Sequence, residues 1–154
     1  MVSYSLSDTP MTQPTRFGVF LLPDFQEIEF WYPVLRLREA RLPVTVVGLK
    51  AEETVFSRLG YPVVPEAAVD AGLDAFDVLV VPGCFAEGAA QPALEKALAQ
   101  AHARGATVAA SGTSIAMLER AGLVRSGKPG ERVLLSSGAD DMPAFAKALL
   151  ATAA

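Results

Sequence analysis

The chain has 154 residues, a net charge of −4 at pH 7, 51% hydrophobic and 19% charged residues, and a mean hydropathy of +0.33. This length suits one domain with a substantial core and is short for two. No cluster of lysine and arginine stands out, which argues against a nucleic-acid partner. No apolar run approaches the roughly 18 residues of a membrane helix, so we expect no membrane partner either.

Residues 1–15 are rich in Ser, Thr, Pro and Gln and lack the basic start and apolar centre of a signal peptide. We interpret them as a mobile tail that precedes a single domain at 16–154. The lone cysteine, Cys84, excludes an internal disulfide, and the lone histidine, His102, leaves too few soft ligands for a zinc site. We therefore expect a cytoplasmic protein without a metal or other cofactor.

Strand and helix patterns alternate from residue 17 onward. Residues 17–22 form a short apolar run typical of a buried strand. Residues 28–41 have near-helical spacing of apolar positions, and Pro33 among them predicts a kinked or late-starting helix. Residues 44–49 are rich in β-branched side chains and predict a second strand, and 52–65 predict a small hairpin.

The second half of the chain continues this alternation. Residues 78–81 are the clearest central strand, and the helix predicted at 92–104 has a proline in its first turn and Gly105 as its stop. The remaining elements are a strand at 107–110, a helix at 113–121, a strand at 132–135 and a helix at 142–151. This order predicts an α/β fold: a single three-layer α/β/α sandwich with a mostly parallel, flavodoxin-like sheet. Residues 78–81 and 107–110 would be neighbouring inner strands.

Three segments follow predicted strands and should meet at one edge of the sheet. They are Pro23-Asp24, Pro82-Gly83-Cys84 and Ser111-Gly112-Thr113. In open α/β sheets, ligands bind in the crevice beyond the carboxyl ends of the strands. The third segment contains a sharp turn from strand to helix, and the first residue of that turn, Gly112, is where a catalytic nucleophile would stand in such a fold.

Four stretches of the chain, taken together, carry a family resemblance. They are residues 26–33 (QEIEFWYP), 44–49 (VTVVGL), 76–83 (FDVLVVPG), and 108–114 (VAASGTS) followed by Ala121-Gly122-Leu123. They resemble the acidic first helix, second strand, D-x-L-x-x-P-G-G loop and elbow of the ThiJ/PfpI superfamily. This superfamily, the DJ-one group, is related to class I glutamine amidotransferases. The match covers roughly 16–123, with a weaker echo at 133–138.

The resemblance implies roles for particular residues. The family's elbow cysteine falls on Gly112, so the chain resembles a degenerate member that lacks this nucleophile. Glu29 matches the glutamate that hydrogen-bonds the elbow thiol, and the amides of Gly83 and Thr113 match an oxyanion site. Cys84 replaces the family's second loop glycine. The histidine that often follows the A-G-L-L helix has no counterpart, and a few dozen residues before the last strand are missing.

The expected ligand pocket is made of Glu29, Gly83, Cys84, Ser111, Gly112, Thr113 and Ser114. No residue of it is a firm catalytic assignment, and Cys84 and Glu29 are the candidates. Cys84 is either a buried structural residue or a relocated thiol whose reactivity depends on the charge of Glu29. The hydroxyls of Ser111, Thr113 and Ser114 are expected to line the pocket or cap a helix, since no histidine can serve as their base.

Three functions remain open at this point. The first is a non-catalytic ligand-binding or structural homologue, homodimeric as such domains often are. Three aromatics in a row, Phe30-Trp31-Tyr32, support a dimer because one helix face cannot bury all of them. The second is a small-molecule hydrolase, hydratase or glyoxal-modifying enzyme that uses Cys84 with Glu29. The third is an orphan sensor module that acts through a partner.

One further motif has the spacing of a phosphate-binding P-loop. Residues 122–129 read GLVRSGKP, with glycines and a lysine at the P-loop positions. The segment follows a helix instead of a strand, and Pro129 stands where a P-loop needs Ser or Thr. We therefore do not interpret it as a P-loop.

Overall fold

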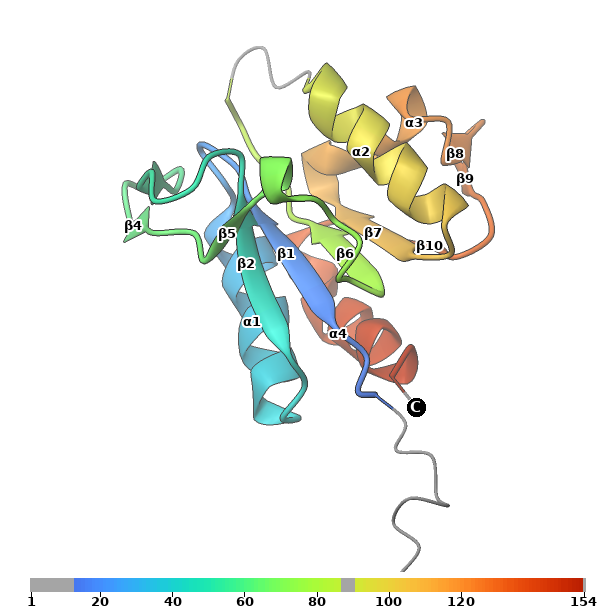
Figure 1. The fold of residues 1–154 in the computed structure, drawn as a ribbon, viewed down its shortest axis with the longest axis horizontal. Helices are drawn as coiled ribbons and strands as arrows, with labels where there is room; N and C mark the ends of the chain where they lie inside the picture. The colour runs from blue at the N-terminus through green and yellow to red at the C-terminus, as the bar shows by residue number, and fades with distance from the viewer. Residues whose placement is uncertain (1–12, 87–90, 154) are drawn as a thin grey trace, which may run out of the picture.

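A six-stranded parallel sheet forms the centre of the molecule, as the computed structural model shows (Figure 1). The structure describes residues 13–86 and 91–153. The strand order is β10-β7-β6-β1-β2-β5, and β6 and β7 are adjacent inner strands as the sequence predicts. The strands are β1 (Phe17–Leu21), β2 (Val44–Gly48), β5 (Ala67–Ala68), β6 (Val78–Val81), β7 (Thr107–Ser111) and β10 (Val133–Ser136).

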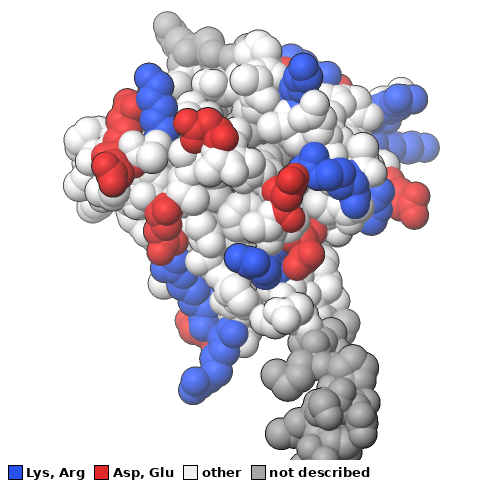
Figure 2. Space-filling model, viewed as in Figure 1, with Lys and Arg blue, Asp and Glu red and all other residues white. Residues whose placement is uncertain are grey.

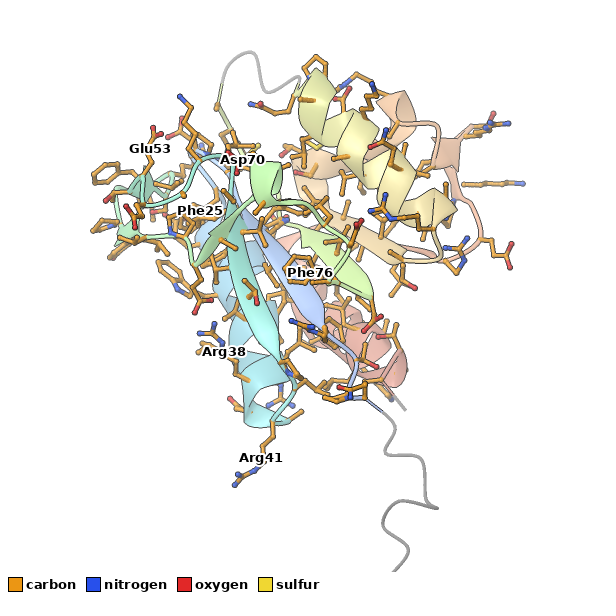
Figure 3. All side chains as sticks on the ribbon, viewed as in Figure 1. Phe25, Arg38, Arg41, Glu53, Asp70 and Phe76 are labelled. Carbon is orange, nitrogen blue, oxygen red and sulfur yellow. The ribbon has the colours of Figure 1, made fainter. Side chains whose placement is uncertain are left out.

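Two helices cover each face of this sheet. Helices α1 (Glu27–Glu39) and α4 (Met142–Ala151) pack on one face, and α2 (Pro92–Ala103) and α3 (Ile115–Arg120) pack on the other (Figure 1). The strands β1 and β6 are buried along their lengths, and β7 is buried after its first residue, because each face of the sheet packs into a separate apolar core. The predicted three-layer α/β/α sandwich is confirmed. Figure 3 shows one aromatic of this packing, Phe76, beside the sheet.

Helix α1 begins directly after its capping residue, Gln26. The side chain of Gln26 accepts a hydrogen bond of 2.7 Å from the Glu29 amide, which satisfies one free N–H of the first turn. Glu27 and Glu29 in that turn and Arg36 in the last turn match the helix dipole. The helix continues through Pro33, so the sequence-based option of a late start is wrong.

Several short elements complete the fold. The predicted hairpin exists as β3 (Val55–Phe56) and β4 (Pro62–Val63). The helix predicted at 113–121 begins as a 3-10 turn over Gly112–Ser114 and becomes α-helical only at Ile115, where α3 starts. A second hairpin, β8 (Val124–Arg125) with β9 (Lys128–Pro129), was not predicted. Two further 3-10 turns lie at Val69–Ala71 and Ala139–Asp141.

The N-terminal tail expected at 1–15 lies, for residues 1–12, outside the described residues. Within residues 13–86 and 91–153, none of the helices has the length and apolar character needed to cross a membrane.

Candidate functional site

The carboxyl ends of β6 and β7 and the first turn of α1 meet around one buried carboxylate. Glu29 is only 5% exposed. Its Oε1 accepts a hydrogen bond of 3.1 Å from the Gly83 amide and one of 2.6 Å from the Ser111 hydroxyl. Gly83 and Ser111 are 54 and 82 positions from Glu29 in sequence, and the parallel sheet brings all three together. Both donors reach the same oxygen of the carboxylate.

Gly112 stands at the elbow between β7 and the 3-10 turn, with φ of +54°. A side chain is strained at such a φ, and glycine is not. A Cβ at this position would lie 2.8 Å from Glu29 Oε1 and 3.1 Å from Oε2. A Cβ at Gly83 would also lie 2.8 Å from Oε1, and one at Gly138 would lie 3.6 Å from Oε2. Gly112 and Gly83 therefore make room for the Glu29 carboxylate, because a Cβ at either position would overlap it, whereas a Cβ at Gly138 would make an ordinary contact.

The hydroxyls of Thr113 and Ser114 tie the elbow to the loop after β6. Thr113 Oγ1 donates to the Cys84 carbonyl at 2.8 Å and accepts from the Cys84 amide at 3.0 Å. Ser114 Oγ donates to the Pro82 carbonyl at 2.7 Å. Both hydroxyl protons are directed to backbone carbonyls, so these side chains hold the two segments in place.

Cys84 lies beside this site in an environment that disfavours a thiolate. Its side chain is buried, and burial is the main effect that raises the pKa of the thiol. The charges of Asp24 and Glu29 raise this pKa further, whereas hydrogen bonds involving the Ser114 side chain and the Ala86 backbone oppose the shift. The net direction is upward, so the thiol stays protonated at neutral pH.

The loop after β1 contributes contacts that sequence reasoning missed. Phe25 forms an isolated backbone bridge with Cys84 and another with Ser57. Gln26 donates its amide to the Gly83 carbonyl at 2.8 Å, in addition to capping α1. Gln is not one of the residues that usually cap a helix, so the capping role of Gln26 had no clear sequence signal.

Gly138 was also missed as a neighbour of Glu29, although it lies within the echo at 133–138.

His102 lies apart from this site. It is in the last turn of α2, and its Nε2 is 2.7 Å from the Glu131 carbonyl. Helix α2 runs back toward the start of β7, so the imidazole is at the opposite end of the sheet from Glu29. Among residues 13–86 and 91–153, no group of three or more His, Cys, Asp and Glu side chains is arranged to hold a metal ion.

One protein family matches most of this chain. The model of the DJ-1/PfpI family matches residues 15–131. The chain belongs to the DJ-1/PfpI family. A search of curated proteins found no match to this sequence.

Solved structures show the same fold at low sequence identity. DJ-1 of Schizosaccharomyces pombe has a TM-score of 0.78 at 15% identity, covering 91% of this chain and 92% of that one. A cysteine-to-alanine mutant of a DJ-1 superfamily protein of Salmonella typhimurium has a TM-score of 0.79 at 22% identity, covering 90% and 89%.

A two-domain protein from Anabaena variabilis, which contains DJ-1/ThiJ/PfpI-like and ferritin-like domains, has a TM-score of 0.81 at 18% identity. The alignment covers 90% of this chain but 48% of the Anabaena protein, so this chain spans about half of that length. At these identities the likeness establishes the fold, and the function has to be argued from the site.

Proposed function

We propose that this chain is a DJ-1/PfpI-family domain that has lost the elbow nucleophile and acts as a non-catalytic ligand-binding or structural homologue. The main support is the position of Glu29 beside Gly112. The elbow residue has no side chain, and Glu29 Oε1 and Oε2 lie 2.8 and 3.1 Å from where a Cβ would stand. A nucleophilic thiol or hydroxyl has no place there unless Glu29 moves.

The hydrogen bonds of the site support the same conclusion. Nucleophilic catalysis at a carbonyl needs an activated nucleophile and free donors near the developing oxyanion. The Gly83 amide, which the family resemblance assigns to the oxyanion site, already donates to Glu29 Oε1 at 3.1 Å. The carboxylate thus occupies a donor that an intermediate would need. A ligand that binds here has to accommodate or displace Glu29.

The alternative enzyme would use Cys84 as a relocated thiol together with Glu29. Two features weigh against this reading. The pKa of the Cys84 thiol is raised, chiefly by burial, and the charge of Glu29 contributes to that rise. A thiol protonated at neutral pH is a poor nucleophile. The alternative nevertheless makes a distinct prediction, because turnover would be lost when the Cys84 thiol is removed.

The deciding experiment measures turnover of an ester, an amide and a glyoxal substrate by the wild type and by Cys84→Ser. Our proposal expects no turnover above background in either protein. It also expects slower alkylation of Cys84 by iodoacetamide at pH 7 in the folded protein than in urea. Turnover in the wild type that disappears in Cys84→Ser would establish the relocated thiol. Robust turnover in Cys84→Ser would refute both readings.

We further propose that the protein is a homodimer that associates through the outer face of α1. Ile28 and Leu35 lie seven residues apart on this face and are 51% and 56% exposed. Trp31, Leu35 and Val64 line one open groove of about 310 Å³ between α1 and the β3–β4 hairpin. Tyr61 of that hairpin packs edge-on against Trp31 at 5.9 Å. Exposed apolar side chains on this face favour a partner, and a second copy offers the same surface.

The third reading, a sensor module, would use this same surface for a different protein. A mixed assembly in place of a homodimer would favour it.

A cytoplasmic location is part of the proposal, since a chain with one cysteine forms no internal disulfide and gains nothing from an oxidising compartment.

A further inference from the structure

The β8–β9 hairpin holds two cations directly opposite each other. Its turn consists of Ser126 and Gly127, with φ of +53° and +74°. Two consecutive residues with positive φ form the mirror-image turn that closes two-residue hairpins. The register pairs Arg125 with Lys128. Directly opposed residues of an antiparallel pair project from the same face, so the guanidinium and the ammonium share one side of the hairpin.

This arrangement is electrostatically unfavourable on its own. Like charges directly opposite each other on a strand pair destabilise the pair. Within residues 13–86 and 91–153, the four ion pairs engage other cations, and neither Arg125 nor Lys128 has a carboxylate within 4.0 Å. Glu131, the nearest acidic residue in sequence, joins none of these pairs. Figure 2 shows basic side chains projecting at the edge of the molecule where Figure 1 places β8 and β9.

The two cations border a cavity. It has a volume of about 420 Å³ and is lined by Gly122, Leu123, Arg125, Lys128, Pro129 and Gly130. Its backbone is fixed by a hydrogen bond of 3.0 Å from the Gly130 amide to the Leu123 carbonyl. An added Cβ at Gly122 would meet no atom within 4 Å, so the rim is open on that side. None of these residues belongs to the site around Glu29.

We propose that this cavity binds a phosphate group, either as free phosphate or as the phosphate of a small organic molecule. A dianion between Arg125 and Lys128 converts a repulsive pair into two attractive contacts. Guanidinium offers a fork of donors that fits phosphate oxygens, and ammonium offers a second point charge. The exposed Pro129 provides an apolar surface for the carbon portion of an ester. The site differs from a P-loop because cationic side chains, and not a loop of backbone amides, bind the anion.

The test is calorimetric titration of the full chain with inorganic phosphate and, separately, with glycerol phosphate, at constant low ionic strength. The double variant Arg125→Gln/Lys128→Gln is compared with Arg41→Gln/Lys147→Gln, which removes the same charge elsewhere. Figure 3 shows Arg41 projecting from the end of α1, far from β8 and β9. All four side chains are exposed, so we expect the variants to fold, and thermal unfolding checks this.

The expected result is saturable binding by the wild type and the control variant, weakened about tenfold or more in Arg125→Gln/Lys128→Gln. Equal affinity for both ligands indicates that the site recognises the phosphate group alone, as in free phosphate. Tighter binding of glycerol phosphate indicates that the ligand is the phosphate of a small organic molecule. Absence of saturable binding of either ligand overturns the proposal. Equal weakening in the two double variants also overturns it, because binding would then reflect net charge alone.

Discussion

At the scale of single residues, Glu29 and Gly112 determine how much space the site offers at the elbow. Glu29 is a buried carboxylate whose Oε1 is held by the Gly83 amide and the Ser111 hydroxyl. Gly112 has a φ that favours glycine and faces both oxygens of Glu29. The two positions are therefore coupled: a larger residue at the elbow requires a different place for the carboxylate.

We predict that Gly112→Ala lowers the free energy of unfolding by about 1–3 kcal/mol or more, from backbone strain and from contact with Glu29. In a Glu29→Ala background the cost should shrink, because the contact is gone and only the strain remains. Denaturant unfolding of the four proteins of this double-mutant cycle measures the coupling.

Gly122→Ala is the matched control, since Gly122 has φ of +81° and a Cβ there would meet nothing within 4 Å. Its cost should be the same with and without Glu29. Equal costs for Gly112→Ala in both backgrounds would show that the contact is unimportant. A cysteine at position 112 would lie near Glu29, as the family resemblance implies for an elbow thiol, but only after the Glu29 carboxylate shifts.

At the scale of elements, the first turn of α1 binds both the elbow and the β3–β4 hairpin. Glu27 Oε2 accepts a hydrogen bond of 2.7 Å from the Leu59 amide in the hairpin. Burial raises the pKa of Glu27, but hydrogen bonds from the Ser57 side chain and from the Leu59 and Glu27 amides, with the charge of Arg58, outweigh it and leave the pKa lowered. Arg58 also stacks on Phe85, 4.0 Å from the ring centroid, which links the hairpin to the loop after β6.

A lowered carboxyl pKa fixes the sign of the pH dependence at this contact. Ionised Glu27 stabilises the folded state above its unfolded pKa, and this contribution is lost as the pH falls through the folded pKa. We predict that Glu27→Gln costs a few tenths to about 1 kcal/mol at pH 7, because the bond is partly exposed. The difference in stability from the wild type should shrink as the pH falls through the folded pKa of Glu27. A difference that stays constant from pH 7 to pH 3 would contradict the role of the charge.

At the scale of the whole molecule, the unpartnered apolar face is the outstanding feature. Phe30 is buried against the sheet, and Trp31 and Tyr32 are half-buried, so none of these three aromatics is fully exposed, whereas the sequence predicts exposure of at least one. Phe56, Leu59 and Tyr61 of the β3–β4 hairpin are more than half exposed. Helix α1 and the β3–β4 hairpin thus both present apolar side chains to solvent.

We predict that light scattering finds a dimer and that Leu35→Arg converts it to a monomer, because a charge would be buried without a partner at the interface. Gln100→Arg, on the exposed side of α2, is the control and should remain dimeric. A wild type that is monomeric at high concentration would contradict the proposed interface.

The periodicity of the sequence predicted most of the sheet correctly for a physical reason. Strands buried on both faces must be continuously apolar, and residues 17–22, 78–81 and 107–110 show this directly. The hairpin β8–β9 escaped prediction because its turn uses Ser126 at a positive φ instead of the usual Asn or Asp. The start of α3 was predicted too early because Gly112–Ser114 forms a 3-10 turn, which leaves no distinct pattern in three residues.

The sequence by itself determined the alternation of strands and helices, the edge at which the segments around Gly83 and Gly112 meet, and the absence of a side chain at position 112. These follow from local patterns and from the rule that parallel strands present their carboxyl ends together, whereas the place of Glu29 at this edge was implied by the family resemblance. Only the tertiary structure decided that the Glu29 carboxylate occupies the elbow space, that Ser111 donates to it, and that burial raises the pKa of Cys84. Distances between side chains that are 82 residues apart depend on how the layers pack, and no local pattern carries that information.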